Sequence, residues 1–244
     1  MNSDELSGKR ILVTGASSGI GKQTAIKISR KGGSVFITGR NKERLEATFH
    51  ELEGSGHLLR TADLTVREEL NALIAEMPEL NGVVYSTGIS DLVPCQFISE
   101  EDIRRNFSVS FEASVLLTSL LLRKKKLVKN NCSLVFVSSL ATKYPFFGGA
   151  MYISSKAALE SYARTLAFEL APKGIRVNCV RPAFIKGPMM QETQEKISKG
   201  AMDKFLERQP LGPGEPEDVA NAIVFYLSPA SRWISASNLD LGGG

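Results

Sequence analysis

The 244-residue chain is 43% apolar and 23% charged, a composition that supplies a sizeable core and argues against disorder. Its formal net charge is +4 and its basic residues are mostly scattered, so we expect no nucleic-acid partner. The longest apolar stretch, 115–122, is far shorter than the roughly 20 residues of a membrane helix, and the start lacks the apolar core of a signal peptide. We therefore expect a cytoplasmic protein with no membrane partner. Three scattered cysteines and two histidines indicate neither a disulfide framework nor a metal site.

Short β-branched or apolar runs alternate with longer helical patterns along the whole chain. The pattern predicts strands at 10–13, 34–37, 57–59, 82–85, 134–137, 175–180 and 238–241, and helices at 20–31, 42–52, 66–76, 100–128, 150–171 and 216–227. Regular alternation of this kind implies crossover connections and a parallel sheet. The prediction is a doubly wound α/β fold with a seven-stranded parallel sheet.

No repeat or linker marks a domain boundary, so residues 1–244 are expected to form a single domain. The exception to the regular pattern is 183–213, a long insertion between the sixth strand and the following helix. Insertions of this length next to a site are often mobile covers, so this segment is a candidate substrate lid.

A glycine-rich turn, Thr14 to Gly21, follows the first strand and opens the first helix. Gly15 permits the tight turn, Gly19 lets the backbone approach a pyrophosphate, and Gly21 lets the helix pack closely. The helix N-terminus presents free N–H groups to an anion. Three glycines at this spacing could equally form a plain turn. The strand before them and the helix after them favour a dinucleotide site. The residues between the glycines, Ser17, Ser18 and Ile20, complete the predicted site.

Arg40 follows the second strand, where an NAD-preferring protein usually offers an acidic residue. A guanidinium can bind a ribose 2′-phosphate, which a carboxylate would repel. This arginine favours NADP(H) as the cofactor. The alternative is a surface arginine that starts a loop and contacts no phosphate.

Tyr152 and Lys156 are four residues apart in a predicted helix, so they share one face. A free phenol has a pKa of about 10, and lowering it to neutral pH requires about 4 kcal/mol. A cation about 4 Å away at an effective dielectric of ~20 supplies an energy of that size, so we expect Lys156 and the positive nicotinamide ring together to lower the Tyr152 pKa, with desolvation of Lys156 subtracting from the effect. Taken alone, the pair is more typical of an ordinary amphipathic helix with an exposed lysine. The strand ending in Ser138 and Ser139 adds to it, because hydroxyls at the carboxyl end of a strand can face the same crevice as the phosphate turn.

Together, the TGxxxGxG spacing of the turn, the serine pair and the YxxxK motif resemble the short-chain dehydrogenase/reductase family, and in particular its 3-oxoacyl-carrier-protein reductases. The resemblance reaches the last strand and its terminal glycines. It implies a Rossmann-type fold in which Ser139 holds the substrate oxygen, Tyr152 exchanges its proton and Lys156 binds the nicotinamide ribose.

The resemblance also assigns further cofactor contacts. It places Asp63, beside Leu64, at the adenine amino group, although this aspartate could equally cap a helix. Ser86, Thr87 and Gly88 stand where the family has an NNAG motif, of which only the glycine is retained. Pro182 retains the first residue of the family's PGxxxT.

Two further positions depart from the family pattern. The catalytic asparagine of the fourth helix is replaced by Ser110, which we expect to preserve the relay water that the family residue holds through its backbone carbonyl. Placing that role on Asn106 is the less favoured alternative. The threonine that binds the nicotinamide carboxamide is replaced by Gly187, so the backbone of Ile185 is expected to hold the nicotinamide.

These features predict an NADP(H)-dependent oxidoreductase that transfers a hydride between nicotinamide and a carbonyl or secondary alcohol. The alternative is a nucleotide-binding protein that kept the fold and lost catalysis. By analogy with the family, a homodimer or homotetramer is expected.

The substrate is left open between a 3-oxoacyl group on a carrier protein and a small apolar ketone. The basic run 123–126 could bind an acidic carrier protein, although it is more typical of a solvated helix end. Aromatic and methionine side chains were candidates for an apolar pocket, namely Tyr144, Phe146, Phe147, Met151, Phe184, Met189 and Met190.

Overall fold

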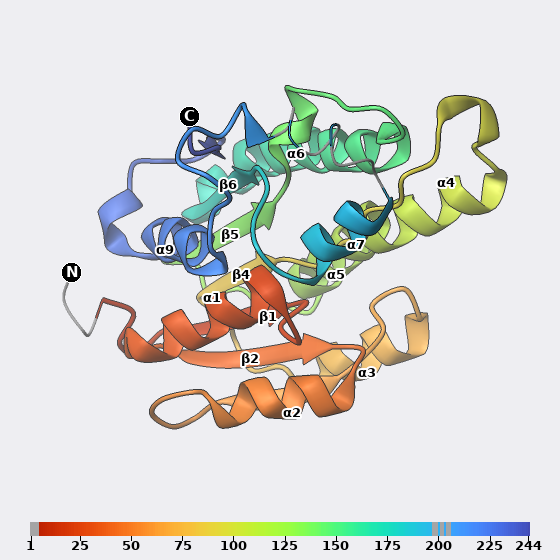
Figure 1. The fold of residues 1–244 in the computed structure, drawn as a ribbon. Helices are drawn as coiled ribbons and strands as arrows, with labels where there is room; N and C mark the ends of the chain where they lie inside the picture. Colours follow the sequence, from red (N-terminus) through yellow and green to blue (C-terminus); the bar gives the residue numbers. More distant parts are fainter. Residues whose placement is uncertain (1–4, 197–199, 201–202, 204–205) are drawn as a thin grey trace.

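The computed structural model describes residues 5–196, 200, 203 and 206–244. Within them lies one parallel sheet whose strand order is β3-β2-β1-β4-β5-β6-β7 (Figure 1). Its strands are β1 (Arg10–Thr14), β2 (Ser34–Gly39), β3 (Leu58–Thr61), β4 (Gly82–Tyr85), β5 (Cys132–Val137), β6 (Ile175–Pro182) and β7 (Asn238–Leu241).

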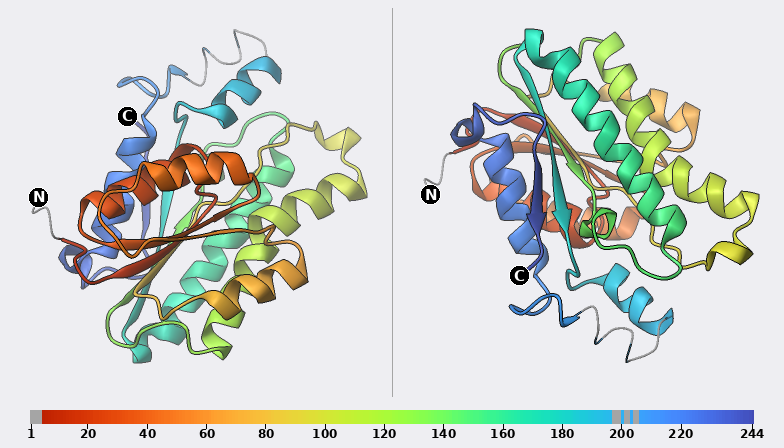
Figure 2. Two further views of the ribbon diagram at one scale, coloured as in Figure 1. Left: turned by 90° about the horizontal axis from the view of Figure 1, so that it is seen from below. Right: turned by 90° about the horizontal axis from the view of Figure 1, so that it is seen from above.

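Helices cover both faces of this sheet. They are α1 (Gly19–Arg30), α2 (Lys42–His50), α3 (Arg67–Glu76), α4 (Glu100–Phe107), α5 (Ala113–Arg123), α6 (Ala150–Leu170), α7 (Pro188–Lys196) and α9 (Pro216–Leu227). Figure 2 shows α9 on one side of the sheet and α6 with α4 on the other. No helix in the described part of the chain is long and apolar enough to cross a membrane.

Strand β5 shows why the sheet is buried on both faces. All six of its residues are buried, as expected for a central parallel strand that reads as a continuous apolar run. Leu134 and Phe136 point into the core under α3, α5 and α6, whereas Val135 and Val137 point into the core under α1 and α9. This strand therefore joins the two cores.

The order of the strands reverses between β1 and β4, which are neighbours in the sheet. In open α/β sheets, ligands bind outside the carboxyl ends of the strands at such a switch point. The glycine-rich turn after β1, the serines after β5 and the start of α6 all lie at this edge. The fold thus brings together residues that are more than a hundred positions apart in the sequence.

The seven strands and the order of the helices are confirmed, with ends that shift by one or two residues. One element was predicted wrongly, since 100–128 is not a continuous helix. Helix α4 is followed by a π-helical segment, Ser108–Glu112, and then by α5, which ends at Arg123. Beyond it, Leu127 pairs with Leu80 in an isolated bridge, because the chain must turn to reach the start of β5.

The segment predicted as a lid is anchored at both ends. Ile185 pairs with Gly214 in an isolated bridge, and the Gln209 side chain accepts a hydrogen bond of 3.1 Å from the Phe184 backbone N–H. Between these anchors, α7 projects beside the carboxyl edge of the sheet (Figure 1). Residues 197–199, 201–202 and 204–205 of the predicted lid lie outside the described residues.

Candidate active site

The turn between β1 and α1 has the close packing that its glycines predicted. Gly15 has a φ of 64°, and a Cβ atom there would lie 2.7 Å from the Ser86 carbonyl oxygen. A Cβ on Gly21 would lie 2.3 Å from the carbonyl oxygen of Gly15, so any side chain would push α1 away from the turn. Ser18 stands at the N-cap of α1 without a side-chain capping bond, so the first N–H groups of the helix remain available to an anion.

The end of β2 lies against this turn. A Cβ on Gly39 would lie 3.3 Å from Ser17 Oγ, which places the next residue, the exposed Arg40, beside the predicted pyrophosphate site. The backbone N–H of Ala62 donates to the Gly39 carbonyl at 3.2 Å and brings the chain leading to Asp63 and Leu64 to the same end of the crevice. The Asp63 carboxylate accepts bonds from the backbone and hydroxyl of Thr65, at 2.9 and 2.7 Å. The carboxylate therefore stabilises the turn at residues 63–65, and both of these bonds are accepted by its Oδ1 atom.

Residues 86–88 link the glycine-rich turn to α6. The Ser86 N–H donates to Thr14 Oγ1 at 3.1 Å, next to Gly15. At the other end of this segment, a Cβ on Gly88 would lie 2.9 Å from Lys156 Nζ and 3.7 Å from Ser110 Oγ. Ser86, Thr87 and Gly88 thus connect the glycine-rich turn to the surroundings of Lys156 without the amides of the family motif.

The structure distinguishes between the two positions considered for the missing asparagine. Ser110 is fully buried, and its hydroxyl accepts a hydrogen bond of 3.4 Å from the Ile89 N–H, beside Gly88 and Lys156. Asn106 is also buried, but its amide donates to the Asp102 carbonyl and to Asp91, at 3.0 and 3.3 Å. Ser110 is therefore the residue that lies next to Lys156.

Ser110 also lies in the π-helical segment, where the wider turn breaks the α-helical hydrogen-bond pattern. Single π turns are frequent at functional sites because they leave backbone groups available to other partners.

Tyr152 and Ser139 meet at the start of α6. The serine side chain lies close enough to the phenol to lower its pKa, and it accepts a bond of 3.2 Å from the Ala141 N–H. Both residues are 8% exposed, so the pair is nearly enclosed. Phe146 covers the tyrosine with its ring, the two centroids being 6.5 Å apart. The tyrosine and serine of the resemblance are thus in contact.

Lys156 lies one turn further along α6. Its Nζ donates to the carbonyl oxygen of Val137 at 2.9 Å and lies 6.0 Å from the centroid of the Tyr152 ring. The side chain is 4% exposed, and burial lowers its pKa to about 8. A buried ammonium with one backbone acceptor retains donors that can bind hydroxyl groups.

The pKa of Tyr152 differs from the expectation. Burial raises it, and the nearby Ser139 side chain opposes that rise only in part. We expected the ammonium of Lys156 and the positive nicotinamide ring together to lower this pKa; among the protein's own groups desolvation dominates, and the lysine is turned toward Val137. The protein's own side chains therefore hold Tyr152 in its protonated form at neutral pH.

The residues after β6 lie at the same edge. Pro182 is the buried last residue of β6, and Ile185 lies partly buried in the bridge to Gly214. A φ of 146° at Gly187 marks the bend that leads into α7. The predicted nicotinamide contacts therefore lie at the base of α7.

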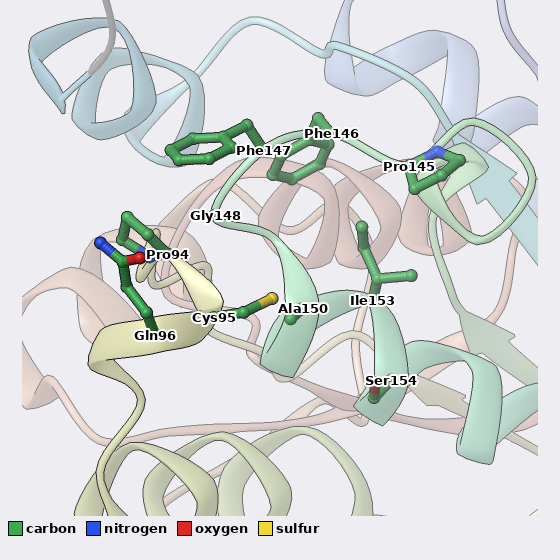
Figure 3. A pocket seen from close by; sticks show the side chains of 10 residues that line it. All are labelled: Pro94, Cys95, Gln96, Pro145, Phe146, Phe147, Gly148, Ala150, Ile153 and Ser154. Carbon is green, nitrogen blue, oxygen red and sulfur yellow. The ribbon is translucent and has the colours of Figure 1, made fainter.

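An apolar cavity of about 510 Å³ opens beside the start of α6 (Figure 3). Of the seven side chains predicted to form a pocket, only Phe146 and Phe147 line it. Its other walls were not predicted, and they are Pro94, Cys95, Gln96, Pro145, Gly148, Ala150, Ile153 and Ser154. Two prolines could have indicated these walls, because Pro94 and Pro145 lie in the loops that follow β4 and β5.

The basic run is far from this site. Arg123 ends α5 just before the chain enters β5, so the run lies at the amino edge of the sheet. The six residues of β5 separate the two edges by about 20 Å. The Lys126 ammonium donates to the Met77 carbonyl, and Arg123, Lys124 and Lys125 are exposed. This position favours the solvated helix end over a docking surface for a carrier protein.

Sequence reasoning missed an ion pair behind the serines, Glu160 with Arg181. The signal was available, because Glu160 is four residues after Lys156 and so lies on the same face of the helix. No group of three or more side chains suited to a metal ion is present among the described residues.

Comparison with known proteins agrees with this geometry. Residues 9–198 match the family model described as short chain dehydrogenase. The chain is 32% identical over 241 residues to a 3-oxoacyl-[acyl-carrier-protein] reductase FabG of Rickettsia bellii, covering 98% of both chains. It is also 32% identical to an L-xylulose reductase of Caenorhabditis elegans, covering 98% of this chain and 96% of that one.

Solved structures give the same result. A short-chain dehydrogenase/reductase from Brucella melitensis superimposes with a TM-score of 0.90 at 29% identity, covering 100% of this chain and 98% of that one. The match extends over the glycine-rich turn, the serine pair and the YxxxK motif. The chain therefore belongs to the short-chain dehydrogenase family of oxidoreductases.

Proposed function

We propose that this protein is an NADP(H)-dependent reductase in which Tyr152 donates a proton to a carbonyl oxygen held by Ser139. The observation that carries the proposal is the buried contact between these two side chains, with Lys156 one turn away. Because burial raises the pKa of Tyr152, the phenol is protonated at neutral pH, as a proton donor must be. The cofactor supplies the hydride that completes the reduction.

The residues of the crevice fit a dinucleotide. The uncapped start of α1 and the tight packing at Gly15 and Gly21 leave room only for backbone beside a pyrophosphate. Lys156 directs its ammonium toward Gly88, where it can bind ribose hydroxyls, and Ser110 supports the relay beside it. Arg40 stands at the position that reads the 2′ substituent, and its charge favours a phosphate there.

The cavity lined by Phe146 and Phe147 favours a substrate with an apolar portion. A 3-oxoacyl thioester meets this requirement and is named in the curated relative from Rickettsia bellii. A small apolar ketone meets it equally. If the substrate is carried by a carrier protein, that protein docks at the carboxyl edge of the sheet, away from 123–126.

The same proposal includes a single catalytic domain, with 183–213 as the lid over the nicotinamide. It also includes a cytoplasmic location and a homodimer or homotetramer. Exposed apolar side chains on the helical face of α4, α5 and α6 support self-association, namely Ile103, Leu116 and Phe168. Sedimentation of the purified protein tests the proposed self-association, and a monomer at micromolar concentration would refute it.

The decisive experiment is NADPH oxidation with a panel of ketones and 3-oxoacyl thioesters. Tyr152→Phe should abolish turnover while binding NADPH as the wild type does. Tyr162→Phe, a matched loss of a phenolic hydroxyl on the same helix, should leave turnover unchanged. If the wild type binds NADPH but is inactive, the alternative of a nucleotide-binding protein without catalysis is favoured. That alternative is supported by the loss of the family residues at positions 86, 87, 110 and 187.

The choice of cofactor has its own test. Arg40→Asp should raise the KM for NADPH by about tenfold or more, because it replaces a charge-assisted contact with repulsion, and should leave the KM for NADH nearly unchanged. Arg123→Asp, the same exchange at the opposite edge of the sheet, is the control. Equal effects of Arg40→Asp on both cofactors would refute the assignment.

A further inference from the structure

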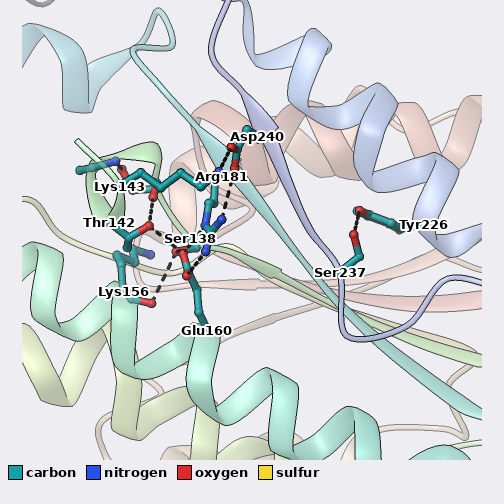
Figure 4. A network of polar contacts seen from close by, with 11 residues as sticks. Ser138, Thr142, Lys143, Lys156, Glu160, Arg181, Tyr226, Ser237 and Asp240 are labelled. Atoms are coloured by element: carbon teal, nitrogen blue, oxygen red, sulfur yellow. Dashed lines mark hydrogen bonds and ion pairs between the residues drawn. The ribbon is translucent and has the colours of Figure 1, made fainter. Parts of the chain in front are cut away.

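A buried carboxylate, that of Glu160, lies against Ser138 (Figure 4). Glu160 belongs to α6, one turn after Lys156, and its side chain is 8% exposed. Its Oε1 accepts hydrogen bonds from Ser138 Oγ at 2.6 Å and from Thr142 Oγ1 at 3.0 Å. These two residues flank Ser139 in the sequence, so the carboxylate binds the chain on both sides of it.

Arg181 of β6 holds this carboxylate in place. Its Nε donates to Glu160 Oε1 at 2.8 Å and its Nη2 donates to Oε2 at 2.5 Å, a two-point contact that fixes the plane of the carboxylate. Burial opposes ionisation of Glu160, but the hydrogen bonds from Arg181, Ser138 and Thr142 outweigh it and lower the pKa. The carboxylate is therefore a charged acceptor for both hydroxyls. Asp240 and Lys143 extend the network to the surface.

The chain around Ser139 is held by α6 at successive points. Lys156 Nζ binds the Val137 carbonyl, and Glu160 binds the Ser138 and Thr142 hydroxyls. Thr142 Oγ1 also lies 2.9 Å from the Ser139 carbonyl oxygen. Ser139 can lie beside Tyr152 only if residues 137–142 stay at a fixed distance from α6. The side-chain hydrogen bonds from Lys156 and to Glu160 set that distance.

We propose that Glu160, fixed by Arg181, is a positioning residue that sets Ser139 against Tyr152 and Lys156 without touching substrate or cofactor. The proposal rests on the proposed function, because it assigns the network a role in that reaction. The competing explanation is a clamp that only stabilises the packing of α6 on β6.

Arg176 provides a matched control. It is a second half-buried arginine of β6, and it donates to the Tyr226 carbonyl at 2.7 Å and to Ser231 Oγ at 2.9 Å. It lies at the amino end of the strand, so it contributes to packing and is remote from Ser139. Arg176→Lys should lower the melting temperature and leave kcat unchanged.

The test compares Ser138→Ala/Thr142→Val, which removes both hydroxyl donors and keeps the ion pair, with Arg181→Lys and Arg176→Lys. A displacement of about 1 Å at a reacting group can cost about a hundredfold in rate. We expect kcat to fall about tenfold or more in the double variant and in Arg181→Lys, with the KM for NADPH changed less than about twofold. Thr142→Ser keeps the hydroxyl and should retain the wild-type kcat within about threefold.

Hydrogen exchange of residues 138–144 gives a readout that does not depend on turnover. The Thr142 N–H donates to the Ser139 carbonyl in this segment, and its protection should fall in the double variant and in Arg181→Lys but not in Arg176→Lys. Unchanged protection would overturn the proposal, as would lost protection with an unchanged kcat. An inactive wild type would refute the proposed function instead, whereas the exchange comparison would still decide whether the network holds Ser139.

Discussion

At the scale of single residues, the site depends on two buried groups whose ionisation is shifted by desolvation. Burial raises the pKa of Tyr152 and lowers that of Lys156 to about 8, so both shifts favour the uncharged forms. The lysine nevertheless has a backbone acceptor, the Val137 carbonyl at 2.9 Å. The protein therefore holds a costly ammonium at the point where the proposed reaction needs a donor.

That cost predicts a pH dependence of stability. Lys156 has a folded-state pKa of about 8 against 10.5 in the unfolded chain, which corresponds to about 3 kcal/mol of destabilisation below pH 8. Between these two values the unfolded chain binds the proton and the folded chain does not, so stability rises with pH.

The measurement is the free energy of unfolding of wild type and Lys156→Met in urea. The variant should be the more stable protein at pH 7, and its advantage should shrink as the pH approaches 10. A constant difference across this range would show that Lys156 is not desolvated.

Ser110 carries a second prediction at this scale. It lies beside Gly88 and Lys156 in the π-helical segment, where the family has asparagine, and we propose that its backbone carbonyl holds the relay water. Ser110→Asn should therefore change kcat by less than about tenfold, as expected when a backbone group rather than a side chain does the work. Steady-state kinetics checks this, and a far larger change would mean that the hydroxyl itself takes part.

At the scale of elements, the start of α1 determines how closely a cofactor can approach. A methyl group on Gly21 would meet the Gly15 carbonyl at 2.3 Å, so the helix and the turn cannot both keep their places. Lys22, the next residue, forms a surface ion pair with Glu51 at 2.8 Å, and such pairs contribute little.

Gly21→Ala should destabilise the protein by about 1–3 kcal/mol, the range for overpacked positions, and should weaken NADPH binding. Lys22→Ala should change stability by less than about 1 kcal/mol. Urea unfolding and fluorescence titration measure the two effects. NADPH binding of wild-type strength in Gly21→Ala would argue against a pyrophosphate at this turn.

At the scale of the whole molecule, two apolar cores on opposite faces of the sheet hold the carboxyl edge in place. Leu134 of central strand β5 is fully buried in the core under α3, α5 and α6, whereas Leu58 of edge strand β3 is 44% exposed. Both leucines lie in strands, so their comparison isolates burial.

Leu134→Ala should cost about 2–5 kcal/mol of unfolding free energy because it leaves a cavity, and Leu58→Ala should cost less than about 1 kcal/mol. Chemical denaturation of both variants tests this. A similar loss of unfolding free energy in both variants would mean that the central strand contributes no more to stability than the edge strand.

The fold, the glycine-rich turn and the position of Tyr152 and Lys156 on one face of a helix could be predicted from the sequence alone, because each depends on local order. Strand runs, helical periodicity and the spacing of Gly15, Gly19 and Gly21 are properties of neighbouring residues. The family resemblance then added the serine and the cofactor contacts. The π-helical segment at 108–112 was not predicted, because the helical pattern of apolar residues continues through it and does not show that the α-helix is interrupted there.

Only the tertiary structure decided which distant residues meet and what their environment does to them. In the folded protein, Glu160 contacts Ser138, Thr142 and Arg181, and the basic run lies at the opposite edge of the sheet from the site. Most of the side chains that line the cavity differ from those predicted. The tertiary structure also turned Lys156 toward Val137, so that desolvation rather than charge governs the Tyr152 phenol. Burial and contacts across the sheet depend on the whole fold, and no window of sequence contains them.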